Sequence, residues 1–233
     1  MKRSGYLAII LGGILLGSQI LLPLAAETMI TRSLKRSISA SEINADIDAF
    51  PALTILGGSA DEITLTGRDV LIGRLLCSEA TATFSDVRID TGHLMDDGKL
   101  LFQRLGHAEA SAWVTEEELA RTLEESVEKL SNVSVTVTPS GIEAQGNYAF
   151  GKLPARIALT GQIIGRGDKI VFVSEQVTLQ HTAIGKLSAN LKTDVELADL
   201  GTLPFAVRIT DIRPTDGRIL LAIEKTTMQE NDQ

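Results

Sequence analysis

The spacing of apolar residues predicts one long helix in the middle of the chain, while most of the remaining chain has the two-residue alternation of β-strands. Between residues 115 and 131 the apolar positions recur at the spacing of a helix, three to four residues apart. This apolar stripe consists of Leu119, Leu123, Val127 and Leu130. Thr115 and Glu118 have the spacing of a capping box, and the acidic residues that follow Thr115 suit the positive end of a helix dipole. The pattern predicts one long amphipathic helix over residues 115–131.

Most of the remaining chain alternates apolar and polar residues, which is typical of β-strands with one buried face. The alternation is clearest in residues 133–138, and turn-forming residues interrupt it at 97–98, 139–141, 165–168 and 216–217. Strands joined by short turns favour an antiparallel sheet, which must roll up to bury its apolar side. We therefore expect a β-rich α+β fold, a curved, mainly antiparallel sheet wrapped around the one long helix.

The N-terminus has the pattern of an export signal or a membrane anchor. Lys2 and Arg3 precede an uncharged, largely apolar run over residues 4–26, and about 20 such residues cross a bilayer. Ala25 and Ala26 could also form a cleavage site, so both alternatives remain for residues 1–26. In either case we expect the rest of the chain outside the cytoplasm, tethered to the outer face of the cytoplasmic membrane or secreted into the envelope. Residues 27–225 form the predicted folded domain, and 226–233 a polar tail.

A second, shorter helix is predicted over residues 27–38. Its apolar side carries Ile30, Leu34 and Ile38, and its opposite side carries Arg32, Lys35 and Arg36. Two interpretations fit this pattern equally well. The helix can lie on the membrane with its basic residues at the headgroups, or it can pack against the domain with a solvated polar face.

The composition and the motifs of the chain argue against several classes of function. The net charge of −8 argues against a nucleic-acid partner, and the single cysteine, Cys77, cannot form a disulfide within the chain. His93, His107 and His181 lack metal-ligand spacing, and no nucleophile elbow, phosphate-binding glycine loop or paired-cysteine motif is present. We therefore expect no enzymatic activity, no cofactor and no metal. What remains is an aliphatic interior, with only 4% aromatic residues, suited to lining a channel for acyl chains.

Four short blocks, in this order, resemble the LmeA-type phospholipid-binding proteins of bacterial envelopes. The blocks are Phe50–Leu53 followed by Asp61–Leu65, then Thr115–Leu119, then Val137–Ile142, and finally Leu203–Thr210 followed by Asp216–Ile219. The resemblance covers about residues 27–225. It departs from the family at Ala206, where members commonly carry glycine. The resemblance implies a tubular lipid-binding-like domain, with a curved, twisted sheet on a long helix and a greasy cleft between them. It implies phospholipid binding or transfer and carries over no catalytic residue.

The resulting hypothesis is an exported, membrane-tethered protein that holds phospholipid acyl chains in an apolar cleft between helix and sheet. The proposed walls of this cleft are Leu119, Leu123 and Val127 on the helix and Ile157, Leu159, Phe172 and Phe205 on the strands. The expected partners are phospholipid acyl chains and the membrane, while the sequence identifies no protein partner. The alternative is a non-enzymatic envelope scaffold or interaction module whose interior is a solid core.

Overall fold

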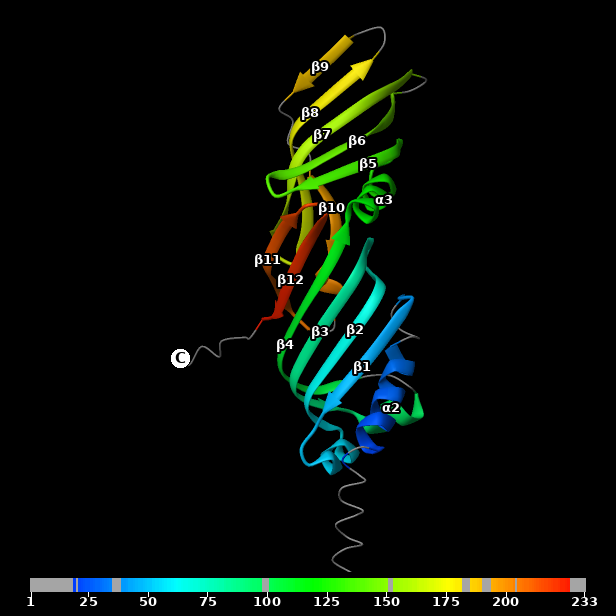
Figure 1. The fold of residues 1–233 in the computed structure, drawn as a ribbon, viewed down its shortest axis with the longest axis vertical. Helices are drawn as coiled ribbons and strands as arrows, with labels where there is room; N and C mark the ends of the chain where they lie inside the picture. Colours follow the sequence, from blue (N-terminus) through cyan, green and yellow to red (C-terminus); the bar gives the residue numbers. More distant parts are fainter. Residues whose placement is uncertain are drawn as a thin grey trace, which may run out of the picture. The chain divides into compact units, whose positions relative to one another are not determined.

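The computed structural model describes residues 19, 21–34, 39–97, 101–150, 153–181, 185–189, 194–203 and 205–226 of the chain. These residues group into two compact units (Figure 1). Unit 1 comprises residues 1–67 and 81–109, and unit 2 comprises residues 68–80 and 110–233. Three long strands contribute residues to both units, so the chain passes between the units several times.

Unit 1 contains short helical segments, the strand β1 and parts of longer strands. Its elements are the helical residues 21–34, β1 (Glu42–Asp48), the 3₁₀ helix η1 (Ala52–Gly57), the start of β2 (Ser59–Ile72), the end of β3 (Leu75–Ile89), α2 (Thr91–Asp96) and the start of β4 (Phe102–Thr115). Ile43 and Ile47 of β1 are buried while the residues beside them face outward, as the alternation predicts. Phe84 and Phe102 stack with ring centroids 5.6 Å apart.

The second predicted helix begins earlier than expected. Residues 21–34 are helical, and Ile30 and Leu34 are buried while Arg32 is exposed. The predicted apolar side therefore packs inward at these two positions, whereas residues 35–38 lie outside the described residues. Among the residues that the structure describes, no helix combines the length and the apolar composition needed to cross a bilayer. Most of the uncharged run over residues 4–26 lies outside that part of the chain.

Unit 2 contains the main helix and most of the strands. Its elements are the end of β2, the start of β3, the end of β4, α3 (Glu116–Ser126), β5 (Leu130–Thr138), β6 (Gly141–Phe150), β7 (Leu153–Arg166), β8 (Lys169–His181), β9 (Gly185–Ala189), β10 (Asp194–Asp199), the 3₁₀ helix η2 (Leu200–Thr202), β11 (Val207–Thr215) and β12 (Arg218–Lys225). The predicted turns at 165–168 and 216–217 are confirmed. Gly167 and Gly217 adopt the left-handed backbone there, with φ of 66° and 81°.

The strands form two six-stranded sheets instead of the single sheet that we expected. The first sheet has the order β1-β2-β3-β4-β12-β11. The second has the order β10-β8-β7-β6-β5, and β9 pairs with β8; its pairings from β5 through β10 are antiparallel. Within unit 2, β11 packs against β5 and β7 and β12 packs against β5, so part of the first sheet covers the second. The prediction of a β-rich, antiparallel fold is confirmed.

The main helix is shorter than predicted. It begins as expected after Thr115, but it ends at Ser126, and Val127 already has extended backbone with φ −112° and ψ 106°. Lys129 takes a positive φ of 70°, which reverses the chain direction. Leu130 then opens β5 and pairs with Tyr148. The stripe of helical spacing therefore continues into a strand, because sheet pairing overrides the helical pattern after residue 126.

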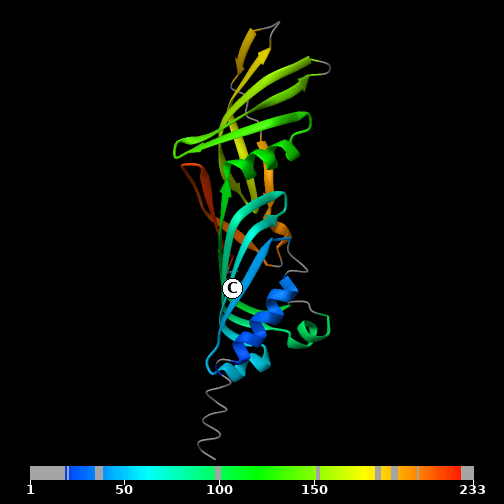
Figure 2. The same cartoon turned by 45° about the vertical axis from the view of Figure 1, so that its right-hand side comes forward.

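The second sheet nevertheless curls around this short helix, as Figure 2 shows. Its two edge strands are β5 and β10, at opposite ends of the strand order. Both of these edges contact α3. A sheet whose two edges reach the same helix must be strongly curved, so the second sheet is a half-barrel that α3 helps to close.

Candidate functional site

The start of α3 is fixed by hydrogen bonds that its sequence predicts. The amide of Thr115 donates to Glu118 Oε2 at 2.7 Å, and the amide of Glu118 donates to Thr115 Oγ1 at 3.4 Å. This capping box satisfies two amides that a helix start leaves without partners. Thr122, one turn later, donates to the carbonyl of Glu118 at 2.9 Å. These contacts fix where α3 begins and stabilise its first turns.

Acidic side chains of α3 also cover the open edge of β5. Glu116 Oε1 accepts a hydrogen bond from the amide of Val137 at 2.7 Å. The carboxylate of Glu124 accepts from the amides of Asn132 and Val133 at 3.3 and 3.4 Å. The amides of an edge strand otherwise remain open for pairing with another chain. Here the helix takes the place of a neighbouring strand and closes the half-barrel along this edge.

Behind that edge the interior of unit 2 is filled by its own side chains. Leu119 and Leu123 are each 2% exposed, and Phe172 of β8 is 1% exposed. They belong to one cluster with residues of β3, β4, β10 and β12. Leu119, Ile163 and Ile219 line one spot in this interior where the side chains leave no space for a water molecule. We call this spot the filled seam. At this point between helix and sheet the interior is filled.

The structure separates the seven predicted lipid-contact residues into two groups. Leu119, Leu123 and Phe172 lie together in the buried cluster, and the half-buried Leu159 packs against it. The remaining three residues are half-buried and lie outside that cluster: Val127, Ile157 and Phe205. Val127 is displaced because the helix has ended before it.

The inner face of the second sheet continues beyond the buried cluster. Side chains at alternate positions of β7 point to one face, and Leu159 and Ile163 of that face join the cluster. Ile157 lies on the same face and pairs with Leu179 of β8 across the strands. Ile157, Leu159 and Leu179 are all half-buried, so this end of the apolar face is partly open. Sequence reasoning identified Ile157 and Leu159 but missed Leu179. Counting alternate positions of β8 from Phe172 does not reach Leu179, because a register shift between Ser174 and Gln176 changes which positions face inward.

At the other end of β7 a groove opens to the surface. Its volume is about 160 Å³. It is lined by the turn between β5 and β6 and by residues of β7, β11 and β12, among them Ile142, Ile163, Ile212 and Ile219. Ligand pockets commonly enclose about 300–1,000 Å³, so this groove is too small for a whole lipid. Ile163 and Ile219 line both the groove and the filled seam behind it, and they separate the two. The sequence did not indicate the groove, because no local pattern places β11 opposite β7.

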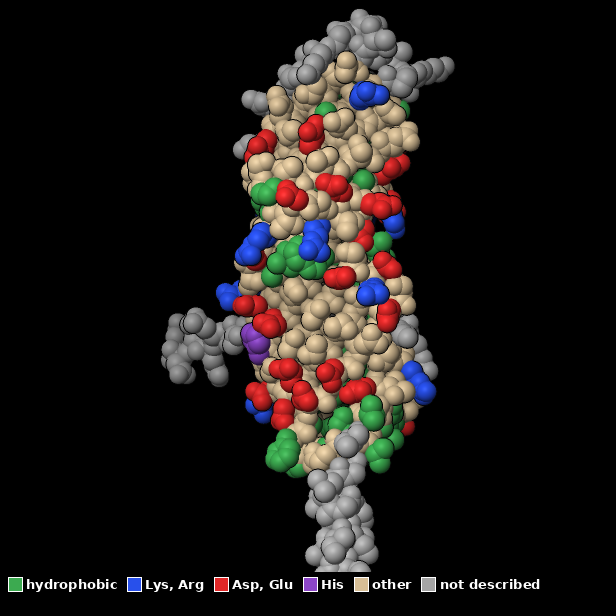
Figure 3. Space-filling view, in the orientation of Figure 1, with side chains coloured by type: hydrophobic (Ala, Val, Ile, Leu, Met, Phe, Trp, Pro, Cys, Tyr) green, Lys and Arg blue, Asp and Glu red, His purple; other side chains and the backbone are tan. Residues whose placement is uncertain are grey.

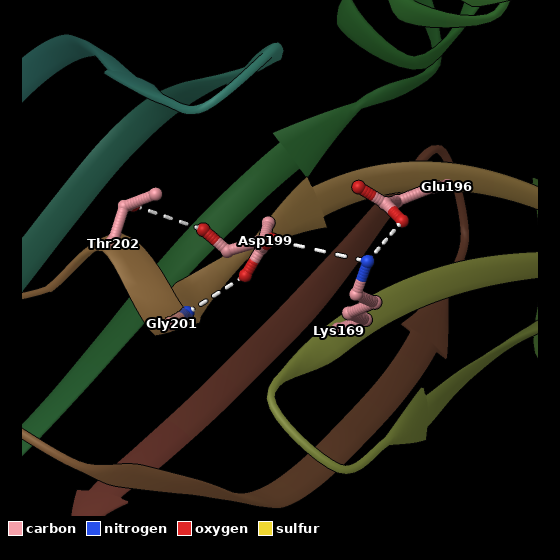
Figure 4. Close-up of polar contacts among 5 residues, drawn as sticks. All are labelled: Lys169, Glu196, Asp199, Gly201 and Thr202. Atoms are coloured by element: carbon pink, nitrogen blue, oxygen red, sulfur yellow. Dashed lines mark hydrogen bonds and ion pairs between the residues drawn. The ribbon is translucent and has the colours of Figure 1, made fainter.

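Polar side chains join the start of β8 to the end of β10. Figure 4 shows Lys169 between two carboxylates, with Nζ 2.7 Å from Glu196 and 3.8 Å from Asp199. The hydrogen bond and charge of Glu196 raise the pKa of Lys169. The other oxygen of Asp199 accepts from the amide of Gly201 at 2.9 Å, and Thr202 donates to the Asp199 carbonyl at 3.1 Å. These contacts fix the end of the β8–β10 pair and the start of η2.

The titratable residues of the described part of the chain form no candidate metal site, and Cys77 is buried. No group of three or more His, Cys, Asp or Glu side chains there is placed to hold a metal ion. Burial raises the pKa of the Cys77 thiol to about 12, and the nearby charge of Glu118 adds to this effect. A thiol with such a pKa is protonated and unreactive at neutral pH.

Comparison with known families decides the class of the protein. Residues 17–224 match the family described as LmeA-like phospholipid-binding. The chain belongs to this family. The match covers most of the chain and includes all elements of both units from the first helical segment to nearly the end of β12. Comparisons with curated proteins and with solved structures returned no match.

Proposed function

We propose that this LmeA-like protein is held at the outer face of the cytoplasmic membrane and binds phospholipid acyl chains in unit 2. The observation that carries the proposal is the family match over residues 17–224. The membrane tether is supported by the sequence, since Lys2 and Arg3 precede the uncharged run over residues 4–26. A tether keeps the binding unit close to its lipid source, so moderate affinity suffices for lipid transfer.

The inner face of β6, β7 and β8 offers the acyl chain its first contacts. Ile157, Leu159 and Leu179 are partly open on this face before any movement of the protein. From Ile157 to Ile163 the face extends roughly 20 Å, at about 3.3 Å per strand residue. One leaflet of a bilayer has a hydrocarbon thickness of roughly 15 Å, half of the bilayer core. The face is therefore long enough to accept one extended acyl chain.

Deeper binding requires the filled seam to open. An acyl chain that replaced water on Ile157 and Leu159 would gain about 0.8 kcal/mol for each methylene that it buries. That gain can offset the free-energy cost of separating α3 from β5, which breaks the hydrogen bonds of Glu116 and Glu124 to the β5 edge. In this mechanism α3 acts as the movable wall of the cleft, and Leu119 and Leu123 face the chain once the wall has moved.

Photo-crosslinking in the native membrane tests this assignment. A photoreactive amino acid at Ile157 should yield a phospholipid adduct, which mass spectrometry of the purified full chain identifies. Ile164 provides the matched control, since it is also half-buried on β7 but points to the opposite face. The absence of adduct at Ile157, or equal adducts at both positions, would contradict binding on the inner face.

A second measurement addresses transfer. Leu159→Ser should lower the amount of phospholipid that the full chain moves between vesicles at least severalfold, because a hydroxyl replaces part of the apolar face. Ile164→Ser should leave transfer near the wild-type rate. If the wild-type chain carries no lipid and moves none between vesicles, the proposed function is wrong.

A specific observation favours a second candidate, a non-enzymatic scaffold of the envelope. The interior between α3 and the second sheet is packed without room for a water molecule beside Leu119. A scaffold needs only this packed core and a surface for a protein partner. The same crosslinking experiment separates the candidates, because a scaffold gives a protein adduct from surface positions and no lipid adduct from Ile157.

A further inference from the structure

One end of unit 1 exposes large apolar side chains on a short element. In η1 and the residue pair before it, Phe50 is 82% exposed, Leu53 45% and Leu56 64%. Only Ala52 of this element is fully buried, so η1 is anchored by one small residue and presents its larger ones to the outside. Single exposed leucines are ordinary, but three large apolar residues within seven positions indicate a contact surface.

The start of the first helical segment lies beside η1. The amide of Ala52 donates to Oε1 of Gln19 at 3.0 Å. Leu21 and Leu24 follow within two turns and are also exposed. Together these residues define the apolar end of unit 1, which consists of Leu21, Leu24, Phe50, Leu53 and Leu56. In Figure 3 hydrophobic side chains gather at the end of unit 1 where η1 lies in Figure 1.

Two observations identify what covers this surface. The apolar end lies where the uncharged run of residues 4–26 enters the folded unit, since Gln19 belongs to that run. Exposed acidic residues also lie on either side of η1 in the chain, Asp46 and Asp48 at the end of β1 and Glu62 near the start of β2; we call them the acidic belt. Figure 3 shows acidic side chains gathered next to the apolar end on the face that it draws. Asp61 belongs to the same belt and accepts a hydrogen bond from the amide of Phe50 at 2.7 Å. Carboxylates must stay in water, so the apolar end can enter a nonpolar layer only as far as this belt.

We propose that the apolar end of unit 1 inserts into the surface of the bilayer that holds the N-terminal segment. Phe50, Leu53 and Leu56 enter the boundary between headgroups and acyl chains, and the acidic belt sets the depth. The contact depends on apolar burial and not on basic residues, so it needs no anionic lipid. This inference rests on the proposed tether and does not require a lipid to be bound in unit 2.

Fluorescent labels at single cysteines test the insertion. The native Cys77 is fully buried with a raised pKa, so it does not compete for a thiol-reactive dye in the folded chain. The full chain is labelled at Leu56→Cys or at Thr66→Cys and reconstituted into vesicles of phosphatidylethanolamine and phosphatidylglycerol. Thr66 is the matched control, exposed and seven residues beyond the start of β2, or roughly 23 Å along the strand. A third label, at Ile14→Cys, reports the tether itself.

We expect lipids brominated near the headgroup to quench the label at Leu56 at least threefold more than the label at Thr66. Aqueous iodide should show the opposite preference. Phe50→Ser together with Leu53→Ser should make the Leu56 label as accessible to iodide as the Thr66 label. These outcomes support the proposal.

Two outcomes would overturn it. In the first, the Ile14 label is quenched by brominated lipid while the labels at Leu56 and Thr66 are equally open to iodide, so that the chain is tethered without insertion of its apolar end. In the second, the Leu56 label is protected from iodide but not quenched by lipid, which would mean that protein covers the surface. Neither outcome affects lipid crosslinking at Ile157, so the two proposals fail independently.

Discussion

The carboxylate of Glu116 accepts a hydrogen bond from the amide of Val137, 2.7 Å away, and so joins the first residue of α3 to the edge of β5. The same contact point involves the turn between β11 and β12. The amide of Gly217 donates to the carbonyl of Val137, and the amide of Glu116 donates to the carbonyl of Gly217. Helix, second sheet and the β11–β12 hairpin therefore meet at one set of backbone groups.

Removing the Glu116 side chain should loosen this closure. In Glu116→Ala the amide of Val137 loses its charged acceptor, which should lower the free energy of unfolding by about 1–2 kcal/mol. If α3 is the movable wall of the lipid cleft, the same variant should transfer lipid between vesicles faster than the wild type. Urea unfolding followed by the fluorescence of Trp113, the chain's single tryptophan, measures the first effect.

Glu116→Gln is the control for that variant. Its amide oxygen can still accept from Val137, so stability and transfer rate should both remain close to the wild-type values. Equal transfer by the wild type, Glu116→Gln and Glu116→Ala would show that separation of α3 from β5 does not limit lipid movement.

The buried face of α3 gives a second prediction. Leu119→Ala should reduce the free energy of unfolding by about 2–5 kcal/mol, because the seam around Leu119 is filled and a cavity would remain. Leu56→Ala, at an exposed leucine of η1, should change it by less than about 0.5 kcal/mol. Chemical denaturation of each full-length variant provides the comparison. A small effect at Leu119 would mean that the seam is much looser than its packing indicates.

Much of this architecture follows from local sequence patterns, and the rest depends on contacts between distant residues. The capping box of Thr115 and Glu118, the alternation in β5 and the turns at Gly167 and Gly217 involve residues only a few positions apart. Local patterns therefore predict them. The end of α3 was predicted wrongly, because Val127 and Leu130 fit a helical stripe as well as a strand. Pairing of Leu130 with Tyr148, eighteen residues away, decides between them.

The residues of the candidate site also divide into those that local patterns predict and those that depend on contacts between distant strands. Ile157 and Leu159 could be selected because alternation along β7 places them on an apolar face. The groove beside Ile163 depends on Ile212 and Ile219, which approach only because β11 and β12 pack on the second sheet. The local spacing of apolar residues does not predict which distant strands pack against each other. The sequence also did not indicate that η1 would expose Leu53 and Leu56, since an apolar run is more often buried.

The backbones of β7 and β8 approach so closely at Gly161 that we expect no larger residue to be tolerated there. A Cβ added there would lie 2.9 Å from Cα of Ser174 and closer still to the carbonyl oxygen of Val173. Backbone atoms cannot move aside as a flexible side chain would, so Gly161→Ala should destabilise unit 2 by at least about 2 kcal/mol. Gly57→Ala, where nothing lies within 4 Å of the added Cβ, should be nearly neutral. Thermal unfolding of both variants tests the contrast, and equal melting temperatures would contradict the close approach.

The buried thiol of Cys77 predicts how stability changes in alkaline solution. Its pKa is raised from 9.0 to about 12, chiefly by burial and further by the charge of Glu118. Between these two values the unfolded chain loses the thiol proton while the folded chain keeps it, so the unfolded state binds fewer protons. The free energy of unfolding should therefore fall as the pH rises through this window, by up to about 1.4 kcal/mol per pH unit from this group. Below the lower value both states are protonated, and Cys77 adds no pH dependence.

Cys77→Ala isolates this contribution from other groups that titrate in the same window. The variant should be less stable at neutral pH because it removes a fully buried side chain, but its stability should fall less steeply above the ordinary thiol pKa. The comparison therefore uses the slopes of the two stability curves and not their absolute values. Parallel slopes for the wild type and Cys77→Ala would show that the thiol ionises as readily in the folded chain as in the unfolded one. In that case the interior beside α3 would admit water, and the seam that Leu119 and its neighbours fill would already be open to solvent.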